Sequence, residues 1–199
     1  MQTSPTAGCP LWPAAKLISD ALGILFYGAQ TGPCRATYTG SEKTAELFTY
    51  DAMGRLSEVS YTTVIGTTGT ITFAWVDGLP KTATFADDGT AIGTTTYEYS
   101  SESLVATYAR NDGSSSSQNA WALTPEGYPS THSFGVYDQS TSSFPVSFYG
   151  HLEYANCRIQ RSCTTQTCAE YSTFQYDDLG RIVSVNDGSS SATYEYVCN

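Results

Sequence analysis

The chain has 199 residues, of which 14% are charged, and its 9 Lys and Arg against 19 Asp and Glu give a formal net charge of −10. Phosphate backbones are bound by clustered cations, so this balance argues against nucleic acid as a partner. The 15 Tyr, with abundant Thr, Ser and Gly, favour strands and turns over helices, and we expect one mainly β structural unit. No apolar run reaches the roughly 18 residues of a membrane-spanning helix, so no transmembrane segment is expected.

The first expected element is an amphipathic helix over 13–26, within an N-terminal segment 1–43. Apolar residues recur at helical spacing from Ala14 to Leu25, and Lys16 and Asp20 lie on the opposite side. Pro13 suits a first helical position. The helix carries no basic face that would bind a membrane surface, so we expect it to pack on the sheet that follows.

From residue 44 to 199 the pattern changes to short alternating strands separated by turn clusters. In the run Ser191–Cys198, for example, Ala192, Tyr194 and Tyr196 share one face. The sequences Asn-Asp-Gly at 111–113 and 186–188 mark hairpin tips, because these residues tolerate positive φ. We expect strands near 47–50, 56–61, 71–76, 94–99, 104–110, 144–154, 171–176, 181–186 and 191–198.

Six cysteines, an even number, predict disulfides and therefore a location outside the cytoplasm: secreted, periplasmic or on the outer surface. We expect Cys9 to pair with Cys34 and leave the other pairings open. One alternative is a zinc site that uses His151 with the cluster around Cys157, although the cysteine spacing there is wider than in most structural zinc sites. The six are Cys9, Cys34, Cys157, Cys163, Cys168 and Cys198.

Cys9 has a second interpretation. Thr6-Ala7-Gly8-Cys9 resembles the end of a bacterial lipobox, in which the cysteine becomes lipidated, although Thr6 stands where Leu is usual. A lipid on Cys9 would leave five thiols, an odd number, so we favour its use in a disulfide.

An internal repeat is the most specific feature of the sequence. Phe-Thr-Tyr-Asp-Ala-Met-Gly-Arg-Leu-Ser-Glu-Val, starting at residue 48, recurs as Phe-Gln-Tyr-Asp-Asp-Leu-Gly-Arg-Ile-Val-Ser-Val, starting at residue 174. The Asp opens a turn by accepting a backbone hydrogen bond, and the Gly takes a left-handed conformation, so the chain reverses there. The structural turn residues are Tyr50, Asp51, Gly54 and Arg55 in the first copy and Tyr176, Asp177, Gly180 and Arg181 in the second.

The pattern Tyr-Asp-x-x-Gly-Arg-Leu/Ile resembles the signature of the YD-repeat, or Rhs-like, family. Weaker echoes make the resemblance extend over about 44–199. It implies consecutive antiparallel hairpins, which in large members of the family wind into a hollow shell. This chain has too few repeats to enclose a folded toxin and lacks the family's self-cleaving core motif. We therefore expect a curved sheet or partly closed barrel, with the 13–26 helix packed on it.

No constellation in the sequence identifies an enzyme, and we assign no catalytic residue, metal or cofactor. The two histidines, His132 and His151, lie in no recognised catalytic motif. Carboxylates at Asp87-Asp88, Asp177-Asp178, Glu98 and Glu195 are interpreted mainly as turn and surface residues, and the Asp-rich turns also offer oxygen ligands for calcium.

We therefore expect a non-catalytic secreted or cell-surface module with a structural or binding role toward a protein or a glycan. The high Tyr content motivates this expectation, because amphipathic aromatic side chains favour contact surfaces. The alternatives are an extracellular hydrolase and a carrier of a small apolar ligand within the rolled sheet. The expected binding residues are Trp75, Trp121, Tyr97, Tyr99, Tyr194 and Tyr196.

Overall fold

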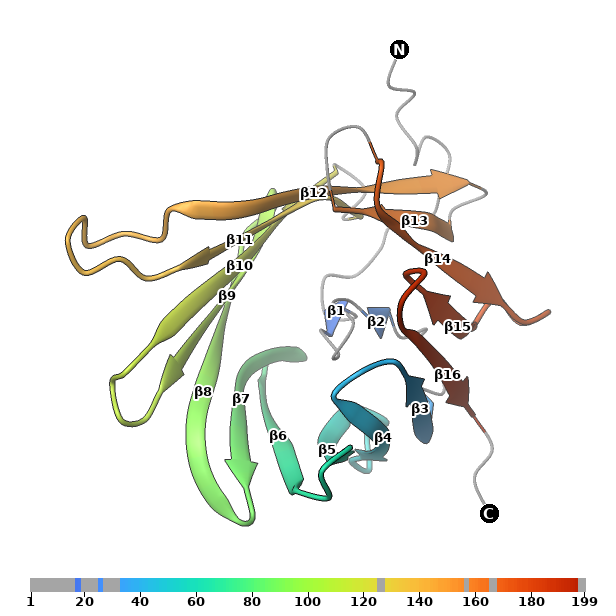
Figure 1. The fold of residues 1–199 in the computed structure, drawn as a ribbon, viewed down its shortest axis with the longest axis horizontal. Coiled ribbons are helices and arrows are strands. Elements are labelled where there is room, and N and C mark those ends of the chain that lie inside the picture. The colour runs from blue at the N-terminus through green and yellow to red at the C-terminus, as the bar shows by residue number, and fades with distance from the viewer. Residues whose placement is uncertain are drawn as a thin grey trace. The chain divides into compact units, whose positions relative to one another are not determined.

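The computed structural model describes residues 17–18, 25–26, 33–124, 128–155, 158–164 and 168–196 (Figure 1). All of the regular secondary structure in these ranges is β-strand, which confirms the all-β prediction. The strands are β1 (Leu17–Ile18), β2 (Leu25–Phe26), β3 (Arg35–Thr39), β4 (Lys43–Tyr50), β5 (Leu56–Thr63), β6 (Thr68–Val76), β7 (Leu79–Asp87), β8 (Thr90–Tyr99), β9 (Ser103–Arg110), β10 (Ser116–Leu123), β11 (Pro129–Val136), β12 (Val146–Ala155), β13 (Arg158–Cys163), β14 (Tyr171–Tyr176), β15 (Ile182–Asn186) and β16 (Ser191–Glu195).

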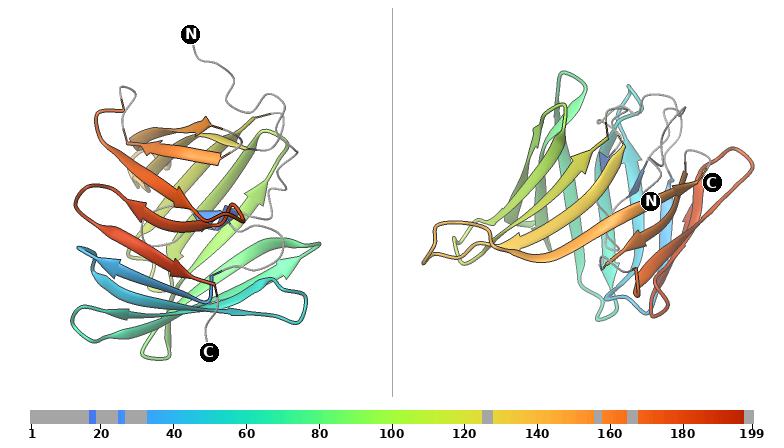
Figure 2. Two further views of the ribbon diagram at one scale, coloured as in Figure 1. Left: turned by 90° about the vertical axis from the view of Figure 1, so that its right-hand side faces the viewer. Right: turned by 90° about the horizontal axis from the view of Figure 1, so that it is seen from above.

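Strands β3 to β16 form one sheet whose hydrogen-bonded order closes on itself as a barrel. Each strand lies next to its neighbours in sequence, and β16, which follows β15, also pairs antiparallel with β3. The sheet is thus a series of consecutive hairpins, as expected, and β16 joins its first strand. Figure 2 shows β16, in red, beside β3, in blue.

The chain divides into two compact units, and the first to consider comprises 15–94 and 174–199. In its described part, alternate residues are buried in β3, β4, β6 and β16, whereas the buried residues of β5, β7 and β15 are three positions apart. Ala36 and Tyr38 in β3 are followed across the sheet by Phe48 in β4 and Val59 in β5, because the register pairs Phe48 with Val59. The core is completed by Leu56, Ile71, Phe73, Ala83, Ile182, Val185, Ala192 and Tyr194.

The described part of the other unit comprises 95–124, 128–155, 158–164 and 168–173. Its described strands run from the second half of β8 through β13 into β14, and each of β9 to β13 pairs with the next. The buried apolar side chains are Tyr97, Leu104, Ala106, Trp121, Tyr128, Leu152 and Ile159.

The N-terminal helix expected over 13–26 is not confirmed. Within that range the structure describes Leu17–Ile18 and Leu25–Phe26, and these pair antiparallel as β1 and β2. An isolated helix of this length is marginal in water, so an apolar pattern alone does not secure it. β3 also lies within the segment 1–43, so the main sheet begins before residue 44.

The prediction of disulfides can be compared with the three described cysteines. Cys163 and Cys168 form a disulfide, and Cys34 is disulfide-bonded as well. Cys9, Cys157 and Cys198 lie outside the described residues, so the Cys9–Cys34 pairing stays a prediction. Within the described ranges, no helix is long and apolar enough to span a membrane.

Candidate functional site

The two Tyr-Asp hairpins, 48–59 and 174–185, have turns with the same hydrogen-bonding geometry. In the first, Asp51 Oδ1 accepts hydrogen bonds from the backbone N–H groups of Met53 and Arg55, both at 2.9 Å, and Oδ2 accepts from Arg55 Nε at 2.7 Å. Gly54 has a φ of 74°, and a Cβ there would meet nothing within 4 Å. The glycine is therefore required by its backbone conformation, and its surroundings leave room for a side chain.

The second hairpin repeats this chemistry. Asp177 accepts from the Arg181 N–H at 2.8 Å and from Arg181 Nε at 2.7 Å, and Gly180 has a φ of 79°. The hydrogen bond from the Arg55 side chain lowers the pKa of the Asp51 carboxyl. The hydrogen bond from the Arg181 backbone N–H lowers the pKa of the Asp177 carboxyl. Both turns are thus held by an ionised carboxylate at neutral pH.

An aromatic ring near the end of the next strand packs against the Arg of each turn and donates a hydrogen bond to the residue that follows this Arg. The guanidinium of Arg55 lies 5.5 Å from the Trp75 ring centroid, and Trp75 Nε1 donates a hydrogen bond to the carbonyl oxygen of Leu56 at 2.8 Å. Arg181 lies 4.3 Å from the Tyr196 ring, whose hydroxyl donates to the carbonyl of Ile182 at 2.7 Å. These rings join one hairpin to the next.

The same device recurs where no Arg is involved. Tyr50, at the end of β4, donates from its hydroxyl to the carbonyl of Pro33 at 2.9 Å. Tyr154, near the end of β12, donates to the carbonyl of Pro129 at 2.7 Å. In each case a ring late in the second strand of a hairpin binds the carbonyl at the start of the first, so part of the high Tyr content has a structural use.

The six rings expected to bind a partner are buried or half-buried. Trp121, Tyr194 and Tyr97 are 2%, 5% and 6% exposed, whereas Trp75, Tyr99 and Tyr196 are half-buried. Burial raises the pKa of the Tyr196 hydroxyl to about 12, an effect that Asp177 reinforces and Arg181 opposes. The structure packs most of the surface of these rings against the sheet. A partner-binding role for the six residues stays a prediction.

A groove of about 590 Å³ lies on the sheet formed by β3 to β6, within the unit of 15–94 and 174–199. The register aligns Arg35, Leu47, Ser60 and Thr70 in one row across these four strands. This row alternates with the buried residues of the same strands, so it faces away from the core. The groove is lined by Arg35, Ala45, Leu47, Ser60, Tyr61, Thr62, Thr68, Gly69, Thr70, Asp88 and Gly89.

One aromatic contact lies on the opposite, core-facing side of the same strands, because Tyr61 shares the face of the buried Val59. A Cβ at Gly69 would overlap the ring of Tyr61, so this glycine is required by the close approach of that ring. The Tyr61 hydroxyl donates to Asp87 Oδ1 at 2.6 Å, and the Lys43 ammonium lies 4.5 Å from the ring centroid. Tyr61 on β5 thus contacts β4, β6 and β7.

The groove offers an array of side-chain hydroxyls. The Ser60 and Thr68 hydroxyls donate to Glu58 and Asp88 and can still accept a hydrogen bond, as those of the other lining threonines also can. Leu47 adds an apolar contact with 54% of its surface exposed. Arg35, at one end, is exposed and has no ion pair among the described residues. The hydroxyls of such a surface match a polar ligand that forms many modest hydrogen bonds.

The His132 environment favours a neutral imidazole ring. His132 Nε2 lies 2.9 Å from Asn119 Oδ1, and its ring stacks on Trp121 with centroids 5.0 Å apart. Burial lowers the pKa of His132 to about 4. The ring is therefore uncharged at neutral pH. Its hydrogen bond is with the side-chain amide of Asn119, not with a serine hydroxyl.

The acidic turns use their carboxylates internally. Asp88 Oδ1 accepts from the Thr68 hydroxyl at 3.2 Å, and Asp187 Oδ1 accepts from the backbone N–H groups of Ser189 and Ser190 at 2.9 and 2.6 Å. These contacts show the Asp residues shaping the hairpin tips.

Sequence reasoning missed a buried carboxylate. Glu46 is 2% exposed; its Oε2 accepts from the Tyr38 hydroxyl at 2.6 Å and its Oε1 from Lys43 Nζ at 2.7 Å. The available signal was its parity, because Glu46 precedes Phe48 by two residues and so shares its buried face.

Comparison with known proteins adds no relative: no protein-family model matches the chain, and no curated protein matches it.

Proposed function

We propose that the chain is a non-catalytic binding module that works outside the cytoplasm, is built from YD-repeat hairpins, and holds a glycan in the groove of β3 to β6. The observation that carries the proposal is the row of hydroxyl side chains between Arg35 and Asp88 along that groove. Sugar hydroxyls both donate and accept, as do those of Ser and Thr, so the two surfaces match.

The alternative of a protein partner is less well supported by the same surface. Peptides that bind sheets by strand addition need an unpaired edge, and the strand order here is closed. Protein interfaces concentrate their binding energy in buried Trp, Tyr and Arg. The groove lining contains one Arg and one Tyr, and the Tyr61 hydroxyl already binds Asp87.

Other features support the location and the family. The Cys163–Cys168 disulfide and the bonded state of Cys34 are compatible with an oxidising compartment. The identical hydrogen bonding of Asp51 and Asp177 supports the interpretation of both hairpins as units of one repeat.

The proposal is tested by glycan binding with the disulfide-intact protein on an array of neutral and acidic glycans, followed by calorimetry on the best ligand. The double variant Arg35→Met/Thr70→Val removes two hydrogen-bonding groups, each contributing about 0.5–1.5 kcal/mol, so affinity should fall roughly 5- to 150-fold.

The control is Thr72→Val, on the same strand and face as Thr70 but outside the groove lining. It should bind as the unmodified protein does. Retention of no glycan, or equal binding by the double variant and the control, would reject the groove as a glycan site. Specific capture of a protein instead would favour the competing partner class.

A further inference from the structure

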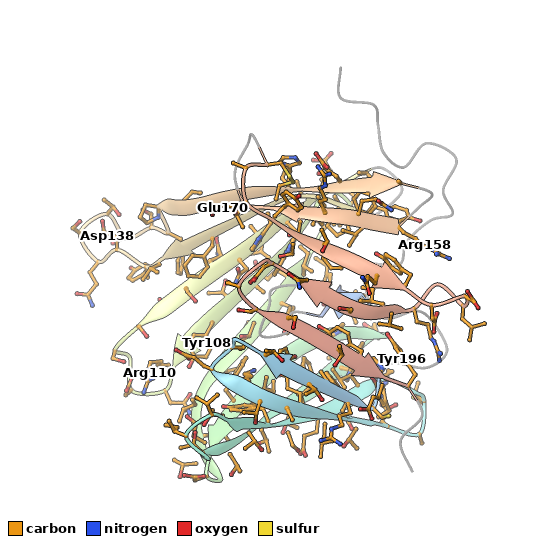
Figure 3. All side chains as sticks on the ribbon, turned by 45° about the vertical axis from the view of Figure 1, so that its right-hand side comes forward. Tyr108, Arg110, Asp138, Arg158, Glu170 and Tyr196 are labelled. Atoms are coloured by element: carbon orange, nitrogen blue, oxygen red, sulfur yellow. A yellow bond between two sulfur atoms is a disulfide. The ribbon has the colours of Figure 1, made fainter. Side chains whose placement is uncertain are left out.

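A separate cluster of metal-ligating side chains lies in the unit of 95–173. His151 and Glu153 alternate along β12 and so share one face, and Cys163 on β13 is the cross-strand partner of His151. Cys168 follows in the connection to β14 and is bonded to Cys163. Figure 3 labels Glu170, which stands two residues beyond Cys168 in this connection. The ligand atoms of the four residues all lie within 4.8 Å of one another.

The four side chains are a ligand set that suits zinc. Zn²⁺ takes thiolate, imidazole and carboxylate ligands in tetrahedral geometry, at bond lengths of about 2.0–2.3 Å. Those bond lengths put neighbouring ligand atoms roughly 3.3–3.8 Å apart. The Nε2 of His151 and the Oε1 of Glu153 already lie 3.7 Å apart. Only the two sulfurs are unsuitable, since as a disulfide they are bonded to each other and carry no charge for a metal.

We propose that reduction of the Cys163–Cys168 disulfide converts this cluster into a zinc site with His151 and Glu153 as the other ligands. A dithiol supplies two electrons and two protons, which break the S–S bond and leave two thiols, while the dithiol becomes a disulfide. Zn²⁺ then binds both sulfurs as thiolates and releases their two protons to solvent. In the reverse direction a small disulfide accepts the two electrons and takes two protons from solvent to become two thiols, while the Cys163–Cys168 bond re-forms and Zn²⁺ is released.

The surrounding charge fits the bound state. Zn²⁺ with two thiolates, one carboxylate and a neutral imidazole carries a net charge of −1. The Arg161 guanidinium lies 3.7 Å from Glu153 Oε2, the oxygen that does not face His151, and so offsets this charge and orients the carboxylate. Arg161 is itself held over the Tyr171 ring, 4.7 Å from its centroid.

The position of the disulfide allows it to open without loss of the fold. Its two cysteines are only 5 residues apart in sequence, so it closes a very short loop. A disulfide restricts the unfolded chain less when the loop is short, so its loss costs less stability than that of a long-range bridge. β12 and β13 also remain paired through the backbone ladder. The His and Glu ligands are therefore still in place in the reduced protein.

The test uses the full chain with Co²⁺ as a spectroscopic substitute for zinc. The protein is reduced with a phosphine, which does not supply a competing thiol, and titrated with Co²⁺. One equivalent should bind with tetrahedral visible absorption and a thiolate-to-cobalt charge-transfer band, and Zn²⁺ should displace it. The oxidised protein should show neither band.

Variants separate this site from the other thiols that reduction exposes. Cys163→Ser/Cys168→Ser, which leaves the remaining cysteines, should abolish the charge-transfer band. His151→Ala should weaken binding by at least roughly 100-fold, because loss of a ligand costs more than loss of a supporting group. Glu170→Gln changes a nearby carboxylate outside the cluster and should bind as the unmodified protein does.

Three results would overturn the proposal. One is an undiminished charge-transfer band in the double serine variant, and another is unchanged affinity in His151→Ala. The third is a reduced protein that loses its β-sheet circular dichroism and does not recover it with Zn²⁺, because a metal that binds only the folded state must stabilise it. The glycan assay on the oxidised protein is independent of all three.

Discussion

Loss of the buried hydrogen bond between Tyr38 and Glu46 should lower the free energy of unfolding more than loss of an exposed polar contact of the sheet. Tyr38→Phe removes the 2.6 Å hydrogen bond to Glu46 Oε2 and leaves that oxygen in a side chain that is 2% exposed. Hydrogen bonds to charged groups contribute about 1.5–3 kcal/mol to stability. Water cannot replace the hydroxyl without entering the core, so we expect a cost of about 2 kcal/mol, which lowers Tm by roughly 4–8 °C in a chain of this size.

Equilibrium urea unfolding with the disulfides intact measures this cost. Tyr137→Phe, which removes a hydroxyl from a ring that is 39% exposed, serves as the control and should change stability by less than about 0.5 kcal/mol. In a Glu46→Gln background the cost of Tyr38→Phe should be smaller, because the acceptor has lost its charge. A loss for Tyr38→Phe equal to that of the control would refute this account of the buried carboxylate.

Three further predictions concern the turn and the stacked histidine. Gly54→Ala should cost about 1 kcal/mol in urea unfolding, because φ there is 74° and Ala disfavours that region, whereas Gly54→Asn should cost less; equal stability of all three proteins would contradict this. The pKa of Asp51 is lower in the folded chain than in the unfolded chain, so its stabilisation is complete at neutral pH and is lost as pH falls through the folded-state value. The stability difference between the unmodified protein and Asp51→Asn should therefore shrink in acid, as followed by unfolding midpoints, and a difference independent of pH would reject the role of the charge. For His132 the folded pKa is about 4 against an ordinary 6.5, so the unfolded chain binds the proton first and stability should fall as pH drops from 6.5 to 4. His132→Gln should remove that part of the pH dependence, and an NMR titration of the ring with a midpoint near 6.5 would contradict the burial argument.

Strands with clear alternation were predictable from the sequence, and those with polar or Pro-containing patterns were not. β14, expected at 171–176, has those bounds in the structure, and β9 differs by one residue from its expected start. β7 was missed because Pro80 follows its first residue, and Pro normally argues against a strand. The structure places Pro80 at a register shift opposite Trp75, where the regular ladder is interrupted.

The hydrogen bonding of the Tyr-Asp turns could be predicted from the sequence, whereas the residues of the groove and of the His151 cluster could not. Asp51 and Gly54 act within a few residues of each other, so local sequence contains the reason for the turn. The meeting of His151 with Cys163 depends on cross-strand register, and a bulge at Glu153 to Tyr154 shifts that register. The groove likewise arises from a row of residues on four different strands, and sequence periodicity does not define which residues of separate strands stand side by side.

The pairing of β16 with β3 determines when the sheet can be completed. The register joins Thr193 to Thr37, so nearly the whole chain must be available before this ladder forms. Each hairpin can fold while the ribosome is still adding residues, but β3 keeps an unpaired edge until β16 emerges. Closure is therefore a late, high-contact-order event that limits the folding rate. Until then the β3 edge offers unpaired backbone groups to other chains, so it is the part of the sheet where aggregation would begin.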